Sequence, residues 1–505
     1  MSGKVYLVGA GPGDPGLATK KGIECIAAAD VVIYDYLASK QLLTFSSENA
    51  ERIYAGKQGG DHTLTQDQIN ALIIEKASAG NMVVRLKGGD PFIFGRGGEE
   101  IEALTAHNIP FEIVPGVTSA IAAPAYAGIP LTHRQYTSSV TFITGHEDPN
   151  KAESMINWEA LAKTGGTLVF LMGVKNLPRI TARLVECGMT SDTPVALVRW
   201  GTTAAQHTVT GTLETINENV AKAGLKPPCI IVVGRVVELR EKMKWFENRP
   251  LLGRRIIVTR ARKQASDMVK KLSDMGAECL EYPVIRVVTP DDTTLLDDAV
   301  NNLSSYDWLV FTSVNGVEVF FSRLEAAGKD TRALGHIQTA AIGPATAERM
   351  KRFGLLADIV PESFRAESIV DAFQDKAVSG KNILLPRAAG ARPILPVELA
   401  KMGAKVEEII AYRTVSDTEE TGGLIESLRK KTIDMVTFTS SSTVTNFKAL
   451  LPEDEFDELI SGITIAAIGP ITAQTAAENG FTVDVEADTY TIDGLCDAIA
   501  TYYGR

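Results

Sequence analysis

Two glycine turns and an arginine in the first half of the chain have the residue types and spacing of a small-molecule site. The turns are Gly9–Gly16 (GAGPGDPG) and Gly88-Gly89-Asp90, and each follows an apolar run typical of a strand. Glycines at such turns let backbone amides approach a ligand closely, and the Asp90 carboxylate can accept hydrogen bonds or complement a cation. Arg96 lies among further glycines and stays charged at ordinary pH, so it suits carboxylate binding. The pattern predicts a small-molecule site at these strand ends.

The first glycine turn leaves a second interpretation open. A G-x-G between a strand and a helix also occurs in dinucleotide-binding domains, although here Asp14 stands at the third glycine position and Pro12 interrupts the pattern. A nicotinamide oxidoreductase built on this turn would bind NAD tightly.

Two further residues have side chains suited to proton transfer. Asp35 follows the apolar run Val31–Tyr34, and Lys57 lies in a glycine-rich segment. As bare sequence, an aspartate at a strand end is often a helix cap, and a lysine in such a loop is usually solvated. His133 and His207 have no second ligand at metal spacing, so the sequence predicts no metal site.

The second half of the chain contains an internal duplication. Thr339–Phe373 and Thr464–Ile499 share the motif AIGP, and Tyr306–Phe321 and Ile433–Phe447 share the motif FTS. Matched positions lie 127 residues apart, falling to 126 at the AIGP pair. Similarity at a fixed offset over this length predicts two alike domains facing one another, and a cleft between twin domains can enclose a large ligand.

Three hydroxyl residues of the duplicated half lie at predicted strand-to-helix turns. They are Ser313, Ser440 and Thr472. With neighbouring backbone amides they could bind carboxylate groups. As bare sequence they are ordinary helix caps, so both interpretations stay open.

Length and composition exclude several classes of protein. At about 150 residues per domain, 505 residues predict three or four domains. The net charge is -11, and residues 1–253 carry 24 Lys and Arg against 25 Asp and Glu, so neither half is a basic nucleic-acid binder. No apolar run is long enough to span a bilayer, and the N-terminus has no signal-peptide pattern. Five scattered cysteines without a CxxC pair indicate reduced thiols and a cytoplasmic location.

The elements that must position these residues alternate between strands and helices, which predicts an α/β fold. A first group of strands, with the signature of a mainly parallel sheet, covers Val5–Val8, Val31–Tyr34, Val83–Leu86 and Phe111–Val114. A second group covers Val140–Thr144, Thr167–Met172, Pro194–Val198 and Cys229–Val233, and Val114–Ala120 joins the two groups. Glu238–Gly253 is predicted to be a helical or extended bridge to the duplicated half.

The first half resembles the tetrapyrrole methylases, and among them uroporphyrinogen-III C-methyltransferase. The resemblance covers about residues 3–245. The motifs that carry it, all in family order, are RLKGGDPFIFGRGGEE (85–100), VPGVTSA (114–120), AGIPLTHR (127–134), TGHE (144–147), LVFLMG (168–173) and VRWGTTAAQHTVTGTL (198–213). It implies S-adenosyl-L-methionine as the methyl donor, bound between two α/β domains, with an anionic macrocycle beside it.

The same resemblance implies roles for individual residues. The donor-binding positions that match the family are Pro12, Gly88, Gly89, Asp90, Ile93, Thr118, Ser119, Met172 and Gly201. Asp35 matches the family's proposed proton acceptor and Lys57 its proposed proton donor. Arg96 is the rival base or a substrate anchor, with Glu99 to orient it. Arg134 and His146 match substrate-facing positions.

The duplicated half resembles uroporphyrinogen-III synthase from about Arg254 to Tyr503. AYRT (411–414), FTSSS (438–442) and AIGPITA (467–473) carry most of this resemblance. It implies two α/β domains joined by a two-stranded link, for which Cys279–Val288 and Val406–Val415 are the predicted crossings. It also implies that Tyr412 assists departure of a hydroxyl group from a linear tetrapyrrole, whereas the alternative for Tyr412 is an aromatic residue that packs between domains.

Together the resemblances imply a bifunctional enzyme that cyclises hydroxymethylbilane and methylates the product twice, towards sirohaem or cobalamin. The expected domains are a methylase at 1–245 (subdomains about 1–115 and 116–245), a linker at 246–253 and a synthase at 254–505. Within the synthase, domain 1 is expected at about 254–284 and 413–505, and domain 2 at about 285–412. The expected partners are small tetrapyrroles, with no nucleic acid, no membrane and no metal, in a homodimer formed through the methylase. An alternative is that only the methylase is active and the duplicated half is a ligand-binding module.

Overall fold

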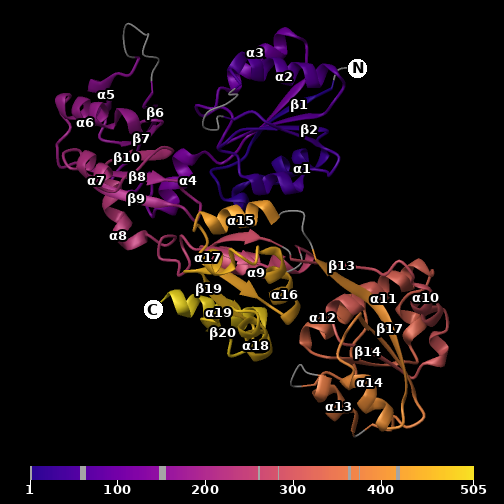
Figure 1. The fold of residues 1–505 in the computed structure, drawn as a ribbon. Coiled ribbons are helices and arrows are strands. Elements are labelled where there is room, and N and C mark those ends of the chain that lie inside the picture. Colours follow the sequence, from indigo (N-terminus) through magenta and orange to yellow (C-terminus); the bar gives the residue numbers. More distant parts are fainter. Residues whose placement is uncertain are drawn as a thin grey trace. The chain divides into compact units, whose positions relative to one another are not determined.

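The computed structural model describes residues 3–56, 64–146, 155–259, 262–282, 284–361, 366–374, 376–416 and 421–504. The chain divides into two compact units (Figure 1). The first comprises Met1–Arg255, Lys270–Cys279 and Ala500–Arg505, and the second comprises Ile256–Val269 and Leu280–Ile499. Among the described residues, no helix combines the length and the apolar character needed to cross a bilayer.

The first unit begins with a five-stranded sheet in the order β3-β2-β4-β1-β5, with every pair parallel. Its strands are β1 (Val5–Gly9), β2 (Val31–Tyr34), β3 (Glu51–Tyr54), β4 (Val83–Lys87) and β5 (Phe111–Val114), and its helices are α1 (Lys20–Ala28), α2 (Gln66–Ser78) and α3 (Gly97–Ala106). The prediction of a mainly parallel sheet is confirmed. Strand β3 was not predicted, because its sequence ERIY is polar and it lies at the sheet edge with two exposed residues. Since parallel strands end at one edge, the loops after β1, β2 and β4 meet there.

A second, mixed sheet follows in the order β6-β7-β10-β8-β9. Its strands are β6 (Val140–Thr144), β7 (Thr167–Leu171), β8 (Pro194–Arg199), β9 (His207–Thr212) and β10 (Cys229–Val233). Its helices are α4 (Ser119–Tyr126), α5 (Trp158–Lys163), α6 (Leu177–Glu186), α7 (Ile216–Lys222) and α8 (Arg240–Met243). Strands β6 and β7 are parallel, whereas β10 is antiparallel to β7 and β8. The threonine-rich edge strand β9, antiparallel to β8, was not predicted.

The predicted join between the two groups of strands leads directly into helix α4. Helix α4 lies beside the second sheet (Figure 1). Its alanines Ala120 and Ala123, with Ala127 just beyond its end, belong to a buried core that includes Val198 and Ile230. Small side chains let the helix backbone lie close to the strands. The N-terminus of α4 follows from β5, so the chain passes from one sheet to the other at this point.

The predicted bridge Glu238–Gly253 begins as part of the first unit. Phe246 is buried, and the ring of Tyr126 at the end of α4 lies 4.8 Å from it. Glu247 accepts hydrogen bonds from Arg240, Gln206 and Thr208 at 2.5–2.9 Å. The bridge, predicted to be helical or extended, is thus helical at Arg240–Met243 (α8), and the residues that follow are packed and hydrogen-bonded.

Two further α/β lobes lie mostly in the second unit, although the ends of several of their elements belong to the first. One sheet has the order β12-β11-β18-β19-β20, with strands β11 (Arg255–Val258), β12 (Glu278–Glu281), β18 (Met435–Phe438), β19 (Thr464–Ala467) and β20 (Val485–Glu486). Its helices are α9 (Arg262–Asp274), α15 (Thr421–Arg429), α16 (Ser441–Leu450), α17 (Phe456–Ile460), α18 (Pro470–Glu478) and α19 (Ile492–Tyr503).

The other lobe repeats this arrangement, in the order β13-β17-β16-β14-β15. Its strands are β13 (Ile285–Val288), β14 (Trp308–Phe311), β15 (Gln338–Ala341), β16 (Asn382–Ala388) and β17 (Lys405–Ser416), and its helices are α10 (Thr294–Asn301), α11 (Val314–Ala326), α12 (Pro344–Arg352), α13 (Ala366–Gln374) and α14 (Ile394–Lys401).

The registers of the two lobes explain the duplication in the sequence. Phe311 pairs with Ala341 across the parallel strands β14 and β15, and Phe438 pairs with Ala467 across β18 and β19. The repeated FTS and AIGP motifs thus occupy the same strand ends in both lobes. The predicted pairing of the two crossing segments is also confirmed, because Val288 of β13 pairs with Arg413 of β17 in antiparallel register.

Candidate active site

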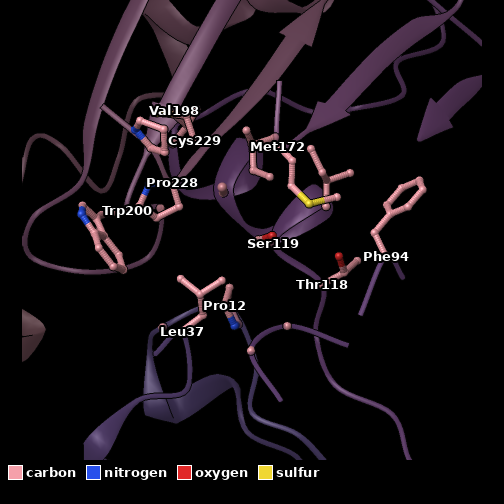
Figure 2. Close-up of a pocket in the computed structure, with 18 of the residues that line it drawn as sticks. Pro12, Leu37, Phe94, Thr118, Ser119, Met172, Val198, Trp200, Pro228 and Cys229 are labelled. Atoms are coloured by element: carbon pink, nitrogen blue, oxygen red, sulfur yellow. The ribbon is translucent and has the colours of Figure 1, made fainter. Parts of the chain in front are cut away.

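The first unit contains a cavity of about 550 Å³ between its two sheets. Loops after β1, β2 and β4 form one wall, and the loops after β7 and β8 with the start of β10 form the other. Figure 2 labels Pro12, Leu37 and Phe94 from the first of these walls and Met172, Val198, Trp200, Pro228 and Cys229 from the second. This volume is ordinary for a site that encloses a small organic ligand.

All nine predicted donor-binding residues line this cavity. They come from five separate loops, and they are Pro12, Gly88, Gly89, Asp90, Ile93, Thr118, Ser119, Met172 and Gly201. His146 also lines it. The family motifs are far apart in the sequence, and the fold of the chain brings them together at this cavity.

Backbone contacts between the first two glycine turns shape the cavity wall. The N–H of Gly89 donates to the carbonyl of Gly11 at 2.7 Å, and the N–H of Gly11 donates back at 3.2 Å. Gly89 has a φ of +71°, which favours glycine. The carboxylate of Asp90 accepts hydrogen bonds from the backbone N–H groups of Phe92 (2.8 Å) and Gly116 (3.0 Å). Asp90 therefore holds its own turn and the join to α4 in place.

A second acidic residue fixes the first turn against the other wall. The backbone N–H of Asp14 donates to the hydroxyl of Thr202 at 3.0 Å, and the hydroxyl of Tyr126 donates to the Asp14 carboxylate at 2.7 Å. Burial and this carboxylate raise the pKa of Tyr126. The ring of Tyr126 also packs on Trp245 and Phe246. The start of the bridge thus supports a loop that lines the cavity.

Asp35 lies next to the cavity in a hydrogen-bonded turn. Its Oδ1 accepts from the backbone N–H groups of Leu37 (3.1 Å) and Ala38 (3.2 Å), both of which line the cavity. Its Oδ2 lies 3.6 Å from the guanidinium of Arg85. The carboxylate therefore caps the turn after β2. A capping role of this kind was the structural alternative that the sequence left open for Asp35.

A buried set of charges lies under the Gly88-Gly89-Asp90 turn. One oxygen of Glu100 accepts hydrogen bonds from Lys87 Nζ (2.6 Å), Gln66 (3.2 Å) and Arg85 Nε (3.3 Å). Arg85, Lys87 and Glu100 are all nearly inaccessible to solvent. Burial, and then the nearby Arg85 cation, lower the pKa of Lys87. Glu100 thus compensates two buried cations at the base of the cavity loop.

Of the predicted substrate-binding residues of this half, His146 lines the cavity, whereas Arg96, Glu99 and Arg134 lie outside its wall. Arg96 begins α3 with a φ of +59°, and its guanidinium makes a bidentate pair with Glu99 at 2.9 and 2.5 Å. The hydrogen bonds to Glu99 raise the pKa of Arg96, and the same pairing lowers the pKa of Glu99. Arg134 is exposed in the turn between α4 and β6. Lys57 lies outside the described residues.

The cavity also contains residues that sequence reasoning missed. Phe94, Met172 and Trp200 line it with left-handed backbone conformations (φ 52°, 57° and 46°), and of these Met172 alone was predicted. Non-glycine residues in this region cost conformational energy and concentrate at functional sites. Phe94 and Trp200 lie within motifs that carry the family resemblance. Their aromatic side chains were the feature by which the sequence could have identified them as cavity residues.

Cys229, at the start of β10, is a buried residue beside the cavity. Burial raises its pKa to about 11, and its sulfhydryl donates to the carbonyl of Lys226 at 3.3 Å. The side chain packs with Ile231 and Val233 in the hydrophobic core of the second sheet.

In the second unit, Tyr412 and Ser313 meet in one lobe. The Tyr412 hydroxyl donates to Ser313 Oγ at 3.0 Å, and Ser313 Oγ accepts from the backbone N–H of Gly316 at the start of α11. The Tyr412 side chain is buried in the core of this lobe under α10, α11 and α12.

Ser440 and Thr472 lie in the other lobe, at the ends of the adjacent parallel strands β18 and β19. Ser440 caps α16 through a hydrogen bond from the N–H of Thr443, and its hydroxyl contacts that of Ser442 at 2.9 Å. Thr472 is buried in the first turn of α18. Ser313 and Ser440 are helix caps in equivalent positions of the two copies.

Comparison with known protein families matches both halves of the chain. The model of tetrapyrrole (corrin/porphyrin) methylases matches residues 4–217, and the model of uroporphyrinogen-III synthase HemD matches residues 266–497. A porphyrin biosynthesis protein HemD from Ruminiclostridium josui is 38% identical over 497 residues, which cover 98% of this chain and 97% of the relative.

The chain belongs to this family of porphyrin biosynthesis proteins. It joins a tetrapyrrole methylase to a uroporphyrinogen-III synthase and is a bifunctional enzyme of tetrapyrrole biosynthesis.

Two further relatives match the methylase half. An S-adenosyl-L-methionine-dependent uroporphyrinogen III methyltransferase from Methanosarcina barkeri is 56% identical over 239 residues, covering 47% of this chain and 94% of the relative. A siroheme synthase from Thiobacillus denitrificans is 50% identical over 244 residues, covering 48% of this chain and 50% of the relative.

The buried charge set under the cavity loop generates a stability prediction. Glu100→Gln removes the anion that compensates Arg85 and Lys87 without changing the side-chain size. We expect it to lower the free energy of unfolding of the first unit by about 3–5 kcal/mol, the usual cost of breaking a buried ion pair. Urea denaturation followed by tryptophan fluorescence measures this change. The control is Glu102→Gln in the same helix, and equal unfolding midpoints for the two variants would contradict the prediction.

Proposed function

We propose that the second half closes hydroxymethylbilane to uroporphyrinogen III and that the first half methylates this product twice, on rings A and B, to precorrin-2. The product then leads towards sirohaem or cobalamin. The observation that carries the proposal is the convergence of all nine donor-binding positions on one cavity, in a chain that belongs to this family.

S-adenosyl-L-methionine is the methyl donor in this proposal, and the cavity is its site. A sulfonium carries an activated methyl group, so the protein must chiefly hold that methyl in line with an electron-rich pyrrole carbon. The paired backbones of Gly11 and Gly89 and the clamped turn at Asp90 supply a rigid wall for this purpose.

The macrocycle lies beside the donor, and fixed cations hold its carboxylates. Arg96 anchors one of them, with Glu99 orienting the guanidinium. Arg134 and His146 contribute further contacts. After methyl transfer a proton leaves the alkylated macrocycle, and we assign its acceptance to Asp35, which immediately precedes cavity residues Tyr36 and Leu37. Lys57 is assigned as the proton donor.

In the synthase half, Tyr412 assists departure of the hydroxyl group of hydroxymethylbilane. Its hydroxyl proton passes to the leaving oxygen, and Ser313 is the hydrogen-bond partner that positions it. Closure through a spiro intermediate inverts the last pyrrole ring, whereas unassisted closure gives the uninverted isomer. Ser440 and Thr472, with neighbouring helix N-termini, bind acetate or propionate groups.

The remaining features of the proposal concern organisation. The methylase occupies about residues 1–245 and the synthase 254–505, with synthase domain 1 at about 254–284 and 413–505 and domain 2 at about 285–412. The protein works without a metal, in the cytoplasm, as a homodimer formed through the methylase.

The direct test supplies purified protein with hydroxymethylbilane, with and without S-adenosyl-L-methionine. We expect uroporphyrinogen III without the donor and its dimethylated product with it, identified by chromatography and mass spectrometry. Formation of the uninverted isomer alone would show that the duplicated half is only a ligand-binding module. Tight binding of NAD without affinity for S-adenosyl-L-methionine would replace the methylase proposal by a nicotinamide oxidoreductase.

Arg96→Ala tests the substrate anchor. We expect turnover of uroporphyrinogen III to fall by about 100-fold or more, since small misplacements of a substrate have effects of this size. Binding of S-adenosylhomocysteine, measured by calorimetry, should persist because Arg96 lies outside the cavity wall. Arg96→Lys retains the charge but loses the bidentate geometry, so intermediate turnover is expected. Wild-type turnover in Arg96→Ala would remove Arg96 from the mechanism.

Tyr412→Phe tests the synthase assignment. Loss of a general acid should lower the rate of closure by about 100-fold or more and raise the share of uninverted product. Tyr306→Phe is the matched control, because Tyr306 is also buried in this lobe and its hydroxyl donates a hydrogen bond to Glu407. An unchanged rate with purely inverted product in Tyr412→Phe would end its proposed role.

A further inference from the structure

Two aromatic residues from opposite walls meet at the donor cavity. Tyr36 follows β2 in the first sheet, and Trp200 follows β8 in the second. Both line the cavity, and their ring centroids lie 5.8 Å apart at an interplanar angle of 64°. An edge-on aromatic contact therefore joins the two walls at this side of the cavity.

The loop that carries Trp200 is held in a strained conformation. Trp200 and Thr202 both have left-handed backbones (φ 46° and 74°), and between them a Cβ on Gly201 would lie 2.3 Å from Ala123 Cβ. The Thr203 hydroxyl donates to the Trp200 carbonyl at 2.8 Å, and the Thr202 N–H donates to Gln206 at 2.8 Å. Such strain persists where surrounding contacts over-determine it, as at ligand clamps. The indole is thus presented by a rigid loop.

The Tyr36 ring is the accessible member of the pair. Its side chain is 52% exposed, whereas its backbone belongs to the turn that Asp35 caps. A ring with few rotatable bonds on a fixed backbone can swing aside at little cost while its partner stays in place. The neighbouring wall is apolar, with Val198, Pro228 and Leu37 (Figure 2).

We propose that Tyr36 and Trp200 form an aromatic clasp across the donor cavity that sets how fast the nucleoside donor and its demethylated product exchange. The proposal rests on the donor site described above. The clasp closes the two walls over an apolar part of the ligand, and separation of the rings accompanies release. Both residues are positioning residues and take no part in the methyl transfer.

The test compares Tyr36→Ala with Tyr36→Phe in the full-length protein, using S-adenosylhomocysteine as the probe. Stopped-flow measurement should show dissociation about 3- to 10-fold faster for Tyr36→Ala, the scale of one aromatic pair, and unchanged for Tyr36→Phe, which keeps the ring. Phe45→Ala is the control, because Phe45 is similarly exposed in the same part of the chain but does not line the cavity. The thermal unfolding midpoint of Tyr36→Ala should match that of wild type, since the side chain is half-exposed.

Trp200→Phe and the double variant Tyr36→Ala/Trp200→Phe complete a double-mutant cycle, in which the dissociation rate of S-adenosylhomocysteine is measured for each protein. Non-additive dissociation rates support a clasp that acts as a unit. Equal dissociation rates for wild type and Tyr36→Ala would overturn the clasp while leaving the donor site intact. A wild-type protein that does not bind S-adenosylhomocysteine would overturn the donor site and the clasp together.

Discussion

The close approach of backbones at the carboxyl edge of a parallel sheet is the constraint on which the cavity of the first unit depends. Strands β1 and β4 are neighbours, so the turns that follow them meet, and Gly11 and Gly89 exchange backbone hydrogen bonds there. No side chain separates the two turns at this contact, because both residues are glycines. Asp90 extends this arrangement to the join at Gly116, and Asp14 extends it to the loop of the second sheet. Two carboxylates of the first wall, those of Asp14 and Asp90, therefore accept hydrogen bonds that brace it against other parts of the first unit.

This arrangement divides the charged residues of the methylase half into two groups. Arg85, Lys87 and Glu100 are buried under the cavity loop and compensate one another, so their role is to hold the strand end. Arg96 is exposed, and among the residues that the structure describes its ion pair is with its neighbour Glu99, so its guanidinium lies at the surface. Similar residue types in one motif thus serve different purposes, and burial decides which purpose each serves.

The two lobes of the synthase half are alike because their repeated motifs lie at equivalent strand ends. The two FTS motifs end equivalent strands, and Ser313 and Ser440 cap equivalent helices. The two copies differ chemically. The hydroxyl of Tyr412 donates a hydrogen bond to Ser313, whereas the hydroxyl of the equivalent Ser440 contacts that of Ser442. The duplication supplies two similar scaffolds, and single residues on them differentiate the lobes.

The sequence by itself determined the α/β class and the duplication, because apolar runs and repeated motifs are local patterns, and its motifs predicted nine positions that line one cavity. It did not determine the edge strands β3 and β9, whose polar residues are paired in the sheet by neighbours distant in the chain. Only the tertiary structure decided that Tyr36 meets Trp200, that Tyr126 links Asp14 to Phe246, and that Glu100 compensates Arg85 and Lys87 together. Most of these contacts join residues that are far apart in the chain. A local sequence pattern constrains only residues that are close in sequence, so contacts of this kind are decided by the packing of helices and sheets.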